Sequence, residues 1–234
     1  LQAAASRGGA TTIAVVNVAE SPLASAADRM VPLHAGEERS VAATKTFIAS
    51  CAALFAIAAR AAGDEALLAG LARLPAALDA LAPRVEEKLA AALSHAESLY
   101  VTGRGPAYGI ALEAALKAKE TAGIHAEAFS VAELMHGPLQ LVQPGFPVVA
   151  FVADDASRDG TLAAIERLRE LGGSVIPIST LDLSEGLHTP STGHAFSDGL
   201  VFALAWYRAT EMAARLRGHD PDRPANLRKV TETV

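Results

Sequence analysis

The stretch SLYVTGRGPAYGIALEAALKAKET, residues 98–121, decides the fold. Its first six residues are typical of a buried strand, and a glycine loop then leads into a helix that we expect from about Ala107 to Thr121. A strand, a glycine loop and a helix in this order form a common phosphate-binding geometry, because the loop amides and the helix N-terminus present unpaired donors to an anion. The GRG loop is a weak signal by itself, since many such loops only allow a tight turn.

The same helix concentrates side chains that are suited to chemistry. Glu113, Lys117 and Glu120 are spaced four and three residues apart and therefore project from one helix face. A carboxylate and an ammonium on one rigid face can move a proton next to a developing negative charge. The same spacing is typical of an exposed helix with surface salt bridges, and spacing alone favours that interpretation.

The residues after this helix repeat the alternation of strands and helices, which predicts right-handed crossovers on a parallel sheet. Trp206 and Tyr207 in the last helix are expected in the core. The polar, proline-interrupted tail should lie as an irregular segment over the surface. The expected elements are a buried strand over 146–153, an amphipathic helix over 157–171, a strand over 174–179 and a final helix over about 198–217.

The residues before the deciding stretch also carry strand and helix patterns. The β-branched run TTIAVVNV, residues 11–18, is typical of a parallel strand buried on both faces. We interpret the alanine-rich apolar run over about 46–62 as a core helix, because it falls short of a convincing membrane span. The other expectations are the end of a helix over 1–7, a short helix starting at 21–22, a strand over 30–34, a long helix beginning near Val41, and two helices over 64–95 divided near Pro83.

An internal repeat links the two ends of the chain. The segment SRGGATTIAVVNV, followed by an acidic linker, MVPLHAG and a long helix, parallels RELGGSVIPIS, which is followed by LDLSEG, LHTPSTG and another long helix. The second copy is preceded by a strand, the GRG loop and a helix, whereas the first copy has nothing upstream of Leu1. We therefore expect that about 100 residues of the first copy, including its own phosphate loop, are missing from this chain.

Composition argues against several classes of partner. The 234-residue chain is 51% hydrophobic, which is ample for a buried core, and its 5% aromatic content favours helix packing over an aromatic-rich sandwich. A formal charge of -6 without a basic block makes nucleic acid and anionic membranes poor partners. The single cysteine, Cys51, is expected as a small buried apolar residue. With no signal peptide in view, it indicates a reducing, cytoplasmic setting.

A longer set of motifs indicates a family. The segment GRGPAYGIALEAALKAKETAGIHAEAFSVAELMHGPLQLV, residues 103–142, resembles the sugar isomerase (SIS) domain family of glucosamine-6-phosphate synthase and its single-chain relatives. The segments SVAATKTF and HDPDRPANLRKVT extend the resemblance, which covers essentially the whole chain in order. The combination is highly specific, unlike the glycine loop alone.

The resemblance implies an α/β fold of tandem SIS subdomains, each a parallel sheet flanked by helices in a flavodoxin-like three-layer arrangement. The first subdomain would be truncated at its N-terminus. The implied organisation is a C-terminal remnant of the first SIS subdomain over 1–62, a helical connector over 63–97, the second SIS subdomain over 98–217 and an active-site tail over 218–234.

The catalytic residues of the family fall on four positions of this chain. The resemblance implies that Glu120 transfers the proton and that Lys117 is the neighbouring active-site lysine. It also implies that His136 opens the sugar ring in the site of the adjacent subunit of a dimer, and that Lys229 forms a Schiff base with the open-chain ketose. Glu113 is then expected to have a structural role.

The resemblance also implies substrate contacts. The backbone of Val41 matches a family contact, whereas Ala43 stands where the synthase has a substrate-contacting serine, so the sugar or its amino substituent is expected to be read differently. Arg104 either approaches an anion or braces a neighbouring acid, with bracing favoured. Arg228, beside the tail lysine, is also predicted to bind substrate.

A metal site is not expected. His125 and Glu127 could join His136 as ligands, but no further ligand at metal spacing is present to complete the site. A structural role in a helix and loop is therefore favoured for His125 and Glu127. Glu133, three residues before the histidine, either orients its imidazole or faces water. We therefore expect neither a metal nor an organic cofactor.

The implied activity is that of a phosphosugar isomerase acting on a hexose or amino-hexose 6-phosphate by C1/C2 proton transfer, with ammonia release if it is a glucosamine-6-phosphate deaminase. Alternatives are a non-catalytic regulator that binds sugar phosphate and the isomerase part of a glutamine-dependent synthase. Neither an amidotransferase nor a DNA-binding module is visible, which favours the isomerase or deaminase. The expected partners are a small-molecule sugar phosphate and a second copy, in a cytoplasmic homodimer with shared active sites.

Overall fold

A five-stranded parallel sheet organises the chain in the computed structural model, which describes residues 8–81 and 83–229, with the backbone alone at 83–86. The strands lie in the order β4-β3-β5-β6-β7, and every neighbouring pair is parallel. Parallel neighbours cannot be joined by a tight turn, so the chain crosses between strands through helices or longer connections. The strands are β3 (Ser98–Gly103), β4 (His125–Ser130), β5 (Pro147–Val152), β6 (Ser174–Ser179) and β7 (Leu187–His188).

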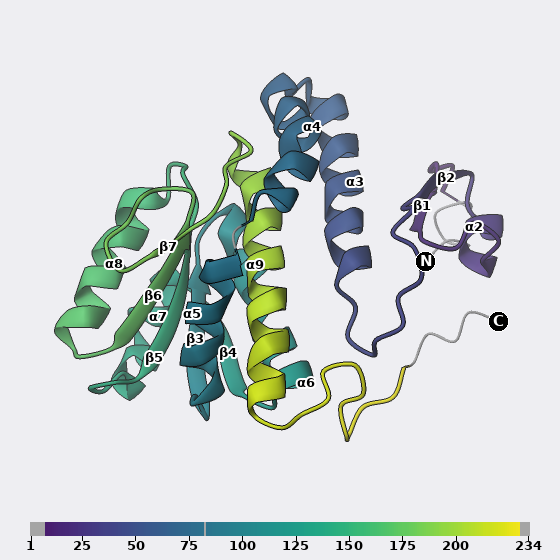
Figure 1. Cartoon of the computed structure of the whole chain (residues 1–234). Coiled ribbons are helices and arrows are strands. Elements are labelled where there is room, and N and C mark those ends of the chain that lie inside the picture. The colour runs from purple at the N-terminus through teal and green to yellow at the C-terminus, as the bar shows by residue number, and fades with distance from the viewer. Residues whose placement is uncertain (1–7, 82, 230–234) are drawn as a thin grey trace.

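Helices cover both faces of this sheet (Figure 1). On one face, Val101 and Phe151 pack in the same apolar cluster as Trp206. On the other face, Val148 packs in a second cluster with Leu168. The predicted three-layer α/β fold is therefore confirmed. The first face carries α5 (Pro83–Ser94), α6 (Pro106–Ala122) and α9 (Ala195–Leu216), and the second carries α7 (Val131–Leu134) and α8 (Arg158–Glu170).

The connection from β3 to α6 depends on two glycines. A Cβ atom on Gly103 would lie 2.6 Å from the carbonyl oxygen of Ala107, a distance that only glycine avoids. Gly105 precedes the helix with a φ of 57°, in the left-handed region that favours glycine. The strand, glycine loop and helix that the deciding stretch predicts are confirmed, and α6 begins at Pro106.

A separate, two-stranded parallel sheet precedes α3. It contains β1 (Ile13–Val16) and β2 (Arg29–Pro32), with α2 (Pro22–Ala26) between them. The order β1, β2, α3 matches the order β6, β7, α9, as the internal repeat predicts. The expectation that the first strand is buried on both faces is wrong: Ala14 and Val16 pack with Ala24, but Ile13 on the other face is 50% exposed.

The long helix α3 (Lys45–Ala62) begins later than its predicted start near Val41. The carboxylate of Glu38 explains the shift: Oε1 accepts the N–H groups of Thr44 and Lys45, at 3.0 Å each. Its Oε2 accepts the N–H of Thr46 at 3.3 Å. A helix leaves its first amides without partners, so Glu38 caps α3 from outside the helix.

The interpretation of α3 as a core helix is correct for one side only. Phe47, Cys51 and Phe55 pack against the main core, beside α9 and α4 (Glu65–Asp79). Leu54 is 53% exposed, and Ala59 is buried. Within the described residues, α3 is the one helix that is long and apolar enough to cross a membrane by length and composition, a test that helices packed in soluble proteins also pass.

Strand β4 was not expected from the sequence. The predicted helix-and-loop position of His125 and Glu127 is wrong, because both lie with exposed side chains in this edge strand. Pairing with β3 determines the strand, since Ser98 stands opposite His125 in the register. Ala126, which lies between His125 and Glu127 in the strand, faces the core under α6. The short elements α7, η1 (Gly137–Leu141) and β7 were missed as well.

The tail is irregular over residues 218–229, as predicted. The helix end predicted over 1–7 and the last tail residues, 230–234, lie outside the described residues. The other helix predictions agree with the structure, including the division of the connector into α4 and α5 near Pro83.

Arg217 joins three chain segments at the end of α9. Its guanidinium donates to the carbonyl oxygens of Ala122 at 2.8 Å, Ser94 at 3.1 Å and Ala96 at 2.9 Å. The carbonyls at the ends of α5 and α6 have no partner inside their own helices, and a cation is favoured at such an end. Arg217 therefore holds α5, α6 and α9 together.

Arg217→Met should lower the free energy of unfolding by about 2 kcal/mol, because three carbonyl groups lose a charged donor. Urea unfolding followed by circular dichroism measures the change. Arg215→Met is the matched control, since Arg215 pairs with Glu211 on the surface and its loss should cost less than about 0.5 kcal/mol. Equal effects of the two substitutions would show that the carbonyl contacts of Arg217 contribute nothing.

Candidate active site

Lys117 and Glu120 form a close ion pair near the C-terminal end of α6. Lys117 Nζ lies 2.6 Å from Glu120 Oε2 and 3.4 Å from Glu113 Oε1. The Lys117 side chain is 6% exposed and that of Glu113 is 9% exposed, whereas Glu120 is 25% exposed. The three charged groups meet, as their spacing predicts, but the interpretation as a surface salt bridge is wrong because Lys117 and Glu113 are buried.

Tyr207 extends this network from α9. Its hydroxyl donates to Glu113 Oε1 at 2.7 Å. Burial raises the pKa of Glu113, and the hydrogen bond from Tyr207 and the charge of Lys117 oppose this shift without cancelling it. Burial, together with the nearby Glu113, raises the pKa of Tyr207 far above its ordinary value, so the phenol remains a donor. Glu113, which was expected to be structural, belongs to the same network as the ion pair.

Cys51 lies on α3 near this network. Burial, with the nearby Glu113 carboxylate, raises the pKa of the Cys51 thiol. A raised pKa reduces the thiolate population on which cysteine nucleophilicity depends. The thiol packs against the main core, as an apolar role predicts, but it is half-buried and not buried as expected.

A cavity of about 330 Å³ lies beside Lys117. Residues of α3, α6 and α9, the loop before α3 and the tail meet around it. One part of its wall is apolar and another carries both signs of charge, which suits a ligand with polar groups and a carbon chain. The apolar residues include Ala42, Ile48, Leu204 and Pro221, and the polar ones include Lys45, Lys117, Tyr207, Arg208 and Glu211.

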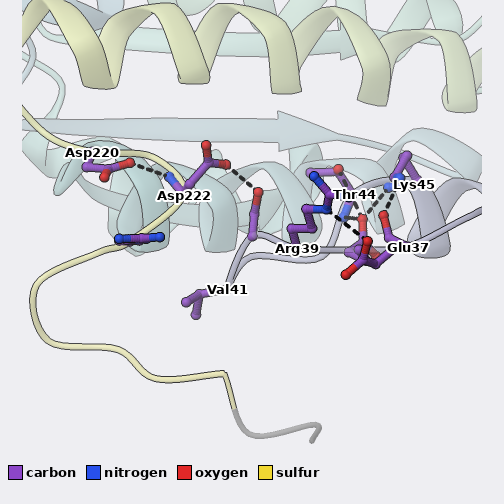
Figure 2. A pocket seen from close by; sticks show the side chains of 10 residues that line it. Glu37, Arg39, Val41, Thr44, Lys45, Asp220 and Asp222 are labelled. Carbon is purple, nitrogen blue, oxygen red and sulfur yellow. Dashed lines mark hydrogen bonds and ion pairs between the residues drawn. The ribbon is translucent and has the colours of Figure 1, made fainter. Parts of the chain in front are cut away.

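A larger cavity of about 1100 Å³ adjoins the first and shares Ser40, Thr44, Lys45 and Asp222 with it. Figure 2 shows this cavity between the loop before α3 and the tail after α9. The two cavities together extend from the Lys117 ammonium to the tail. The charged residues that line the larger one are Glu37, Glu38, Arg39, Lys45, Asp220, Asp222 and Arg223.

The tail is bound to the loop before α3. The N–H of Val41 donates to the carbonyl oxygen of Asp222 at 3.3 Å, and the Ser40 hydroxyl donates to the Asp222 carboxylate. The exposed Lys229 donates from Nζ to the carbonyl oxygen of Ser40 at 3.2 Å. The structure therefore brings Lys229 and Val41 to one loop, which also lines the cavity beside Lys117.

The other predicted substrate contacts are less close to this cluster. Ala43 is exposed between two residues that line the cavity, and Arg228 is exposed beside Lys229. Arg104 lies before the start of α6 at Pro106, and Pro106 is itself about 17 Å along the helix axis from Lys117. Among the described residues, no carboxylate pairs with Arg104, so the favoured expectation that it braces an acid is not met.

His136 lies on the other side of the sheet from α6. It follows α7, whose Leu134 packs in the cluster under α8, and its own side chain is exposed. Within one chain, His136 and Lys117 therefore do not share a site. Glu133 neither orients the imidazole nor simply faces water, since it forms a capping box with Ser130 and accepts the serine hydroxyl at 2.7 Å.

No group of three or more histidine, cysteine, aspartate or glutamate residues in the described part of the chain is arranged to hold a metal ion. His125 and Glu127, the two candidate ligands, point outward from β4. They stand on the same edge strand but form no cluster with His136.

Sequence reasoning did not identify Tyr207 and Glu38 as parts of the site. Tyr207 is 94 residues away from Glu113, so no local spacing connects the two. Glu38 stands further before Lys45 than an N-cap residue does, and only the fold of the intervening loop brings its carboxylate to the helix. An acid before a helix start was the single available signal for Glu38.

The fold and the cavity define an α/β protein with a buried lysine-carboxylate network. A family model for the SIS domain matches residues 92–186. The chain is 36% identical to an isomerizing glutamine-fructose-6-phosphate aminotransferase of Pyrobaculum aerophilum over 97% of its own length. It is 33% identical to the enzyme of the same name from Zymomonas mobilis over 95%. The chain spans 40% of the length of each of these relatives.

Solved structures agree with this match. A protein classed as a phosphosugar isomerase, from Silicibacter pomeroyi DSS-3, aligns with a TM-score of 0.81 and 37% identity, covering 94% of this chain and 68% of that one. The C-terminal domain of glucosamine-fructose-6-phosphate aminotransferase from Francisella tularensis aligns with a TM-score of 0.79 and 28% identity, covering 95% and 68%. The chain belongs to the SIS-domain family, as its motifs indicate.

Hydrogen bonds to Glu38 make its contribution to stability depend on pH. Partial burial pushes the pKa of Glu38 up, but hydrogen bonds from the Thr46 hydroxyl and from the amides at the start of α3 outweigh burial and lower it. A carboxyl group whose pKa is lowered by folding stabilises the protein above its unfolded pKa. That contribution is lost as the pH falls through the folded pKa.

Glu38→Gln should lower the free energy of unfolding by about 1 kcal/mol at pH 7, because the start of α3 loses a charged acceptor. The difference from the wild type should shrink as the pH falls below the unfolded glutamate pKa of about 4.3 and through the lowered pKa of Glu38 in the folded protein. Urea unfolding at several pH values measures it. Glu37→Gln is the control, since Glu37 pairs with Arg39 on the surface. A difference that stays constant down to pH 3 would contradict this account.

Proposed function

We propose that this protein interconverts the aldose and ketose forms of a hexose or amino-hexose 6-phosphate by moving a proton between C1 and C2. With an amino-hexose, the C2 imine that results is hydrolysed by water to a ketose and ammonia, which is the reaction of a glucosamine-6-phosphate deaminase. The observation that carries the proposal is the buried Lys117 ammonium, held 2.6 Å from Glu120 beside a cavity of about 330 Å³.

Glu120 acts as the acid and base. The reaction needs one group that removes the proton from C2 of the aldose and returns it to C1 of the enediolate. Of the two carboxylates around Lys117, Glu120 is the more exposed, at 25%, and Glu113 is turned toward Tyr207. This difference in exposure supports Glu120 as the carboxylate that a substrate can reach.

Lys117 stabilises the negative charge of the enediolate oxygen. A fixed ammonium in a site shielded from water stabilises a developing charge more strongly than the same group in bulk solvent. Two carboxylates, Glu113 and Glu120, hold the Lys117 ammonium in position before substrate binds. The buried position of Lys117 thereby supports its electrostatic role.

Lys229 and His136 complete the proposed site. The Lys229 amine adds to the C2 carbonyl of the open-chain ketose and water leaves, giving a Schiff base that hydrolysis reverses. Its contact with Ser40, which lines both cavities, supports this role. His136 opens the sugar ring from a second copy, in a cytoplasmic homodimer with shared sites. Its exposed position across the sheet from Lys117 supports a contribution in trans.

The substrate contacts at Val41, Ala43, Arg104 and Arg228 remain proposals. Val41 has the strongest support, because its loop lines the larger cavity and is fixed by the tail. Arg104 has the weakest, because it lies at the far end of α6 from Lys117.

A second candidate is the isomerase part of a glutamine-dependent synthase. It is favoured by the relatives named glutamine-fructose-6-phosphate aminotransferase, of which this chain spans 40%. The two candidates differ in nitrogen source, so the full-length protein should be assayed for ammonia released from glucosamine 6-phosphate and for glutamine consumed with fructose 6-phosphate. Binding of sugar phosphate without any turnover would instead indicate a regulator.

Glu120→Gln should slow the exchange of solvent deuterium into C2 of the aldose 6-phosphate by at least about 100-fold, since the variant cannot accept the proton. Proton NMR of the sugar measures the exchange. Glu127→Gln is the control, because Glu127 is an exposed glutamate on β4 and its loss should leave exchange unchanged. Undiminished exchange in Glu120→Gln would rule out its role.

Subunits carrying His136→Ala and Glu120→Gln should each be inactive alone and regain activity when mixed. Half of the dimers in an equal mixture are hybrids with one intact site each, so about a quarter of the wild-type activity is expected. Native mass spectrometry establishes that hybrids have formed. No recovery in a preparation of proven hybrids would show that the two residues do not meet across subunits.

A further inference from the structure

Tyr207 contacts the proposed acid-base network but does not itself touch Glu120. It lies on α9 and is 8% exposed, with its hydroxyl 2.7 Å from Glu113 Oε1. The same Glu113 oxygen lies 3.4 Å from Lys117 Nζ, and the shorter contact of Lys117 is the 2.6 Å bond to Glu120. The four groups therefore form one chain, from the phenol through Glu113 and Lys117 to Glu120.

The Lys117 ammonium lies at unequal distances from the two carboxylates, Glu113 and Glu120. Two carboxylates compete for one ammonium, and the more buried one, Glu113, would gain more from pairing in a low dielectric. Lys117 nevertheless lies closer to Glu120. The hydroxyl of Tyr207 supplies Glu113 with a hydrogen bond that Lys117 would otherwise have to provide.

We propose, on the basis of the function proposed above, that Tyr207 is a positioning residue: by donating to Glu113 it leaves the Lys117 ammonium directed toward Glu120 and the substrate. Without the hydroxyl, Glu113 draws Lys117 away from Glu120. The ammonium then stands further from the enediolate, and Glu120 loses the partner that orients it. Tyr207 thus acts on turnover through Glu113 and Lys117, without contact to the reacting carbons.

The aromatic ring of Tyr207 has a separate, structural role. It packs edge-on against Phe47 of α3, with ring centroids 6.5 Å apart and an interplanar angle of 81°. It also lines the cavity beside Lys117. Tyr207→Phe keeps both contacts and removes the hydroxyl alone, so it separates positioning from packing.

The test measures kcat and KM of the full-length protein for aldose-ketose conversion of glucosamine 6-phosphate and fructose 6-phosphate. Tyr207→Phe should lower kcat about tenfold, the effect of one lost hydrogen bond in a charged network, and leave KM within about twofold. The matched control is Tyr100→Phe, because Tyr100 is also buried and donates to the carbonyl of Pro138 on the other face of the sheet. This control should keep the wild-type kcat.

A double-mutant cycle tests whether Tyr207 acts through Glu113. Glu113→Gln should lower kcat, and the double variant Tyr207→Phe/Glu113→Gln should be no slower than Glu113→Gln alone, because the hydroxyl then has no carboxylate to satisfy. Fully additive losses would overturn the proposed route. A Tyr207→Phe enzyme with wild-type kcat, or one whose entire loss is in KM, would overturn the positioning role while leaving the proposed function intact.

The outcome for the wild type separates the two proposals. If the full-length wild-type protein converts neither substrate, the proposed function fails, and the role of Tyr207 fails with it. If the wild type is active, the comparison of Tyr207→Phe with Tyr100→Phe decides the role of Tyr207 by itself. Thermal unfolding of both variants shows whether any loss of activity follows a loss of folded protein.

Discussion

The burial of the Lys117 ammonium is the constraint on which the site depends. Removing an ammonium from water costs several kcal/mol unless opposite charges and hydrogen bonds replace the lost hydration. Glu113 and Glu120 provide those charges from the same helix, and the Tyr207 hydroxyl on α9 donates a hydrogen bond to Glu113. Because α9 closes over α6, a charge pattern that would be ordinary on a surface becomes a fixed electrostatic element beside a cavity.

The helix α9 connects this network to the rest of the fold. Its start follows β7, its middle carries Trp206 in the main core and Tyr207 at the network, and its end holds α5 and α6 through Arg217. The tail that follows α9 returns to the loop before α3, where Asp222 and Lys229 bind Ser40. One continuous segment therefore supports the buried side of the site and forms part of its outer wall.

Local patterns predicted most of the fold. The strand over 174–179, the division of helices near Pro83 and the length of α6 follow from hydrophobic periodicity and from glycine and proline positions, which short windows contain. The predictions are wrong where contact with a segment far away in the sequence decides the local structure. Strand β4 exists because it pairs with β3, and α3 starts at Lys45 because Glu38 folds back onto its amides. Ile13 is exposed although its strand is apolar, because burial requires another segment to pack on that face of β1, and the strand's own residues do not encode this.

By itself, the sequence determined the order of the longer helices and of strands β1, β2, β3, β5 and β6, the motifs of the SIS-domain family, and the single helix face that carries Glu113, Lys117 and Glu120. Each of these is encoded in local spacing or in a contiguous motif. Only the tertiary structure decided that Lys117 and Glu113 are buried, that Tyr207 joins them, and that Arg104 and His136 lie away from them within the chain. Burial and proximity depend on how α9 and the tail pack onto α6, and no spacing within α6 encodes that packing.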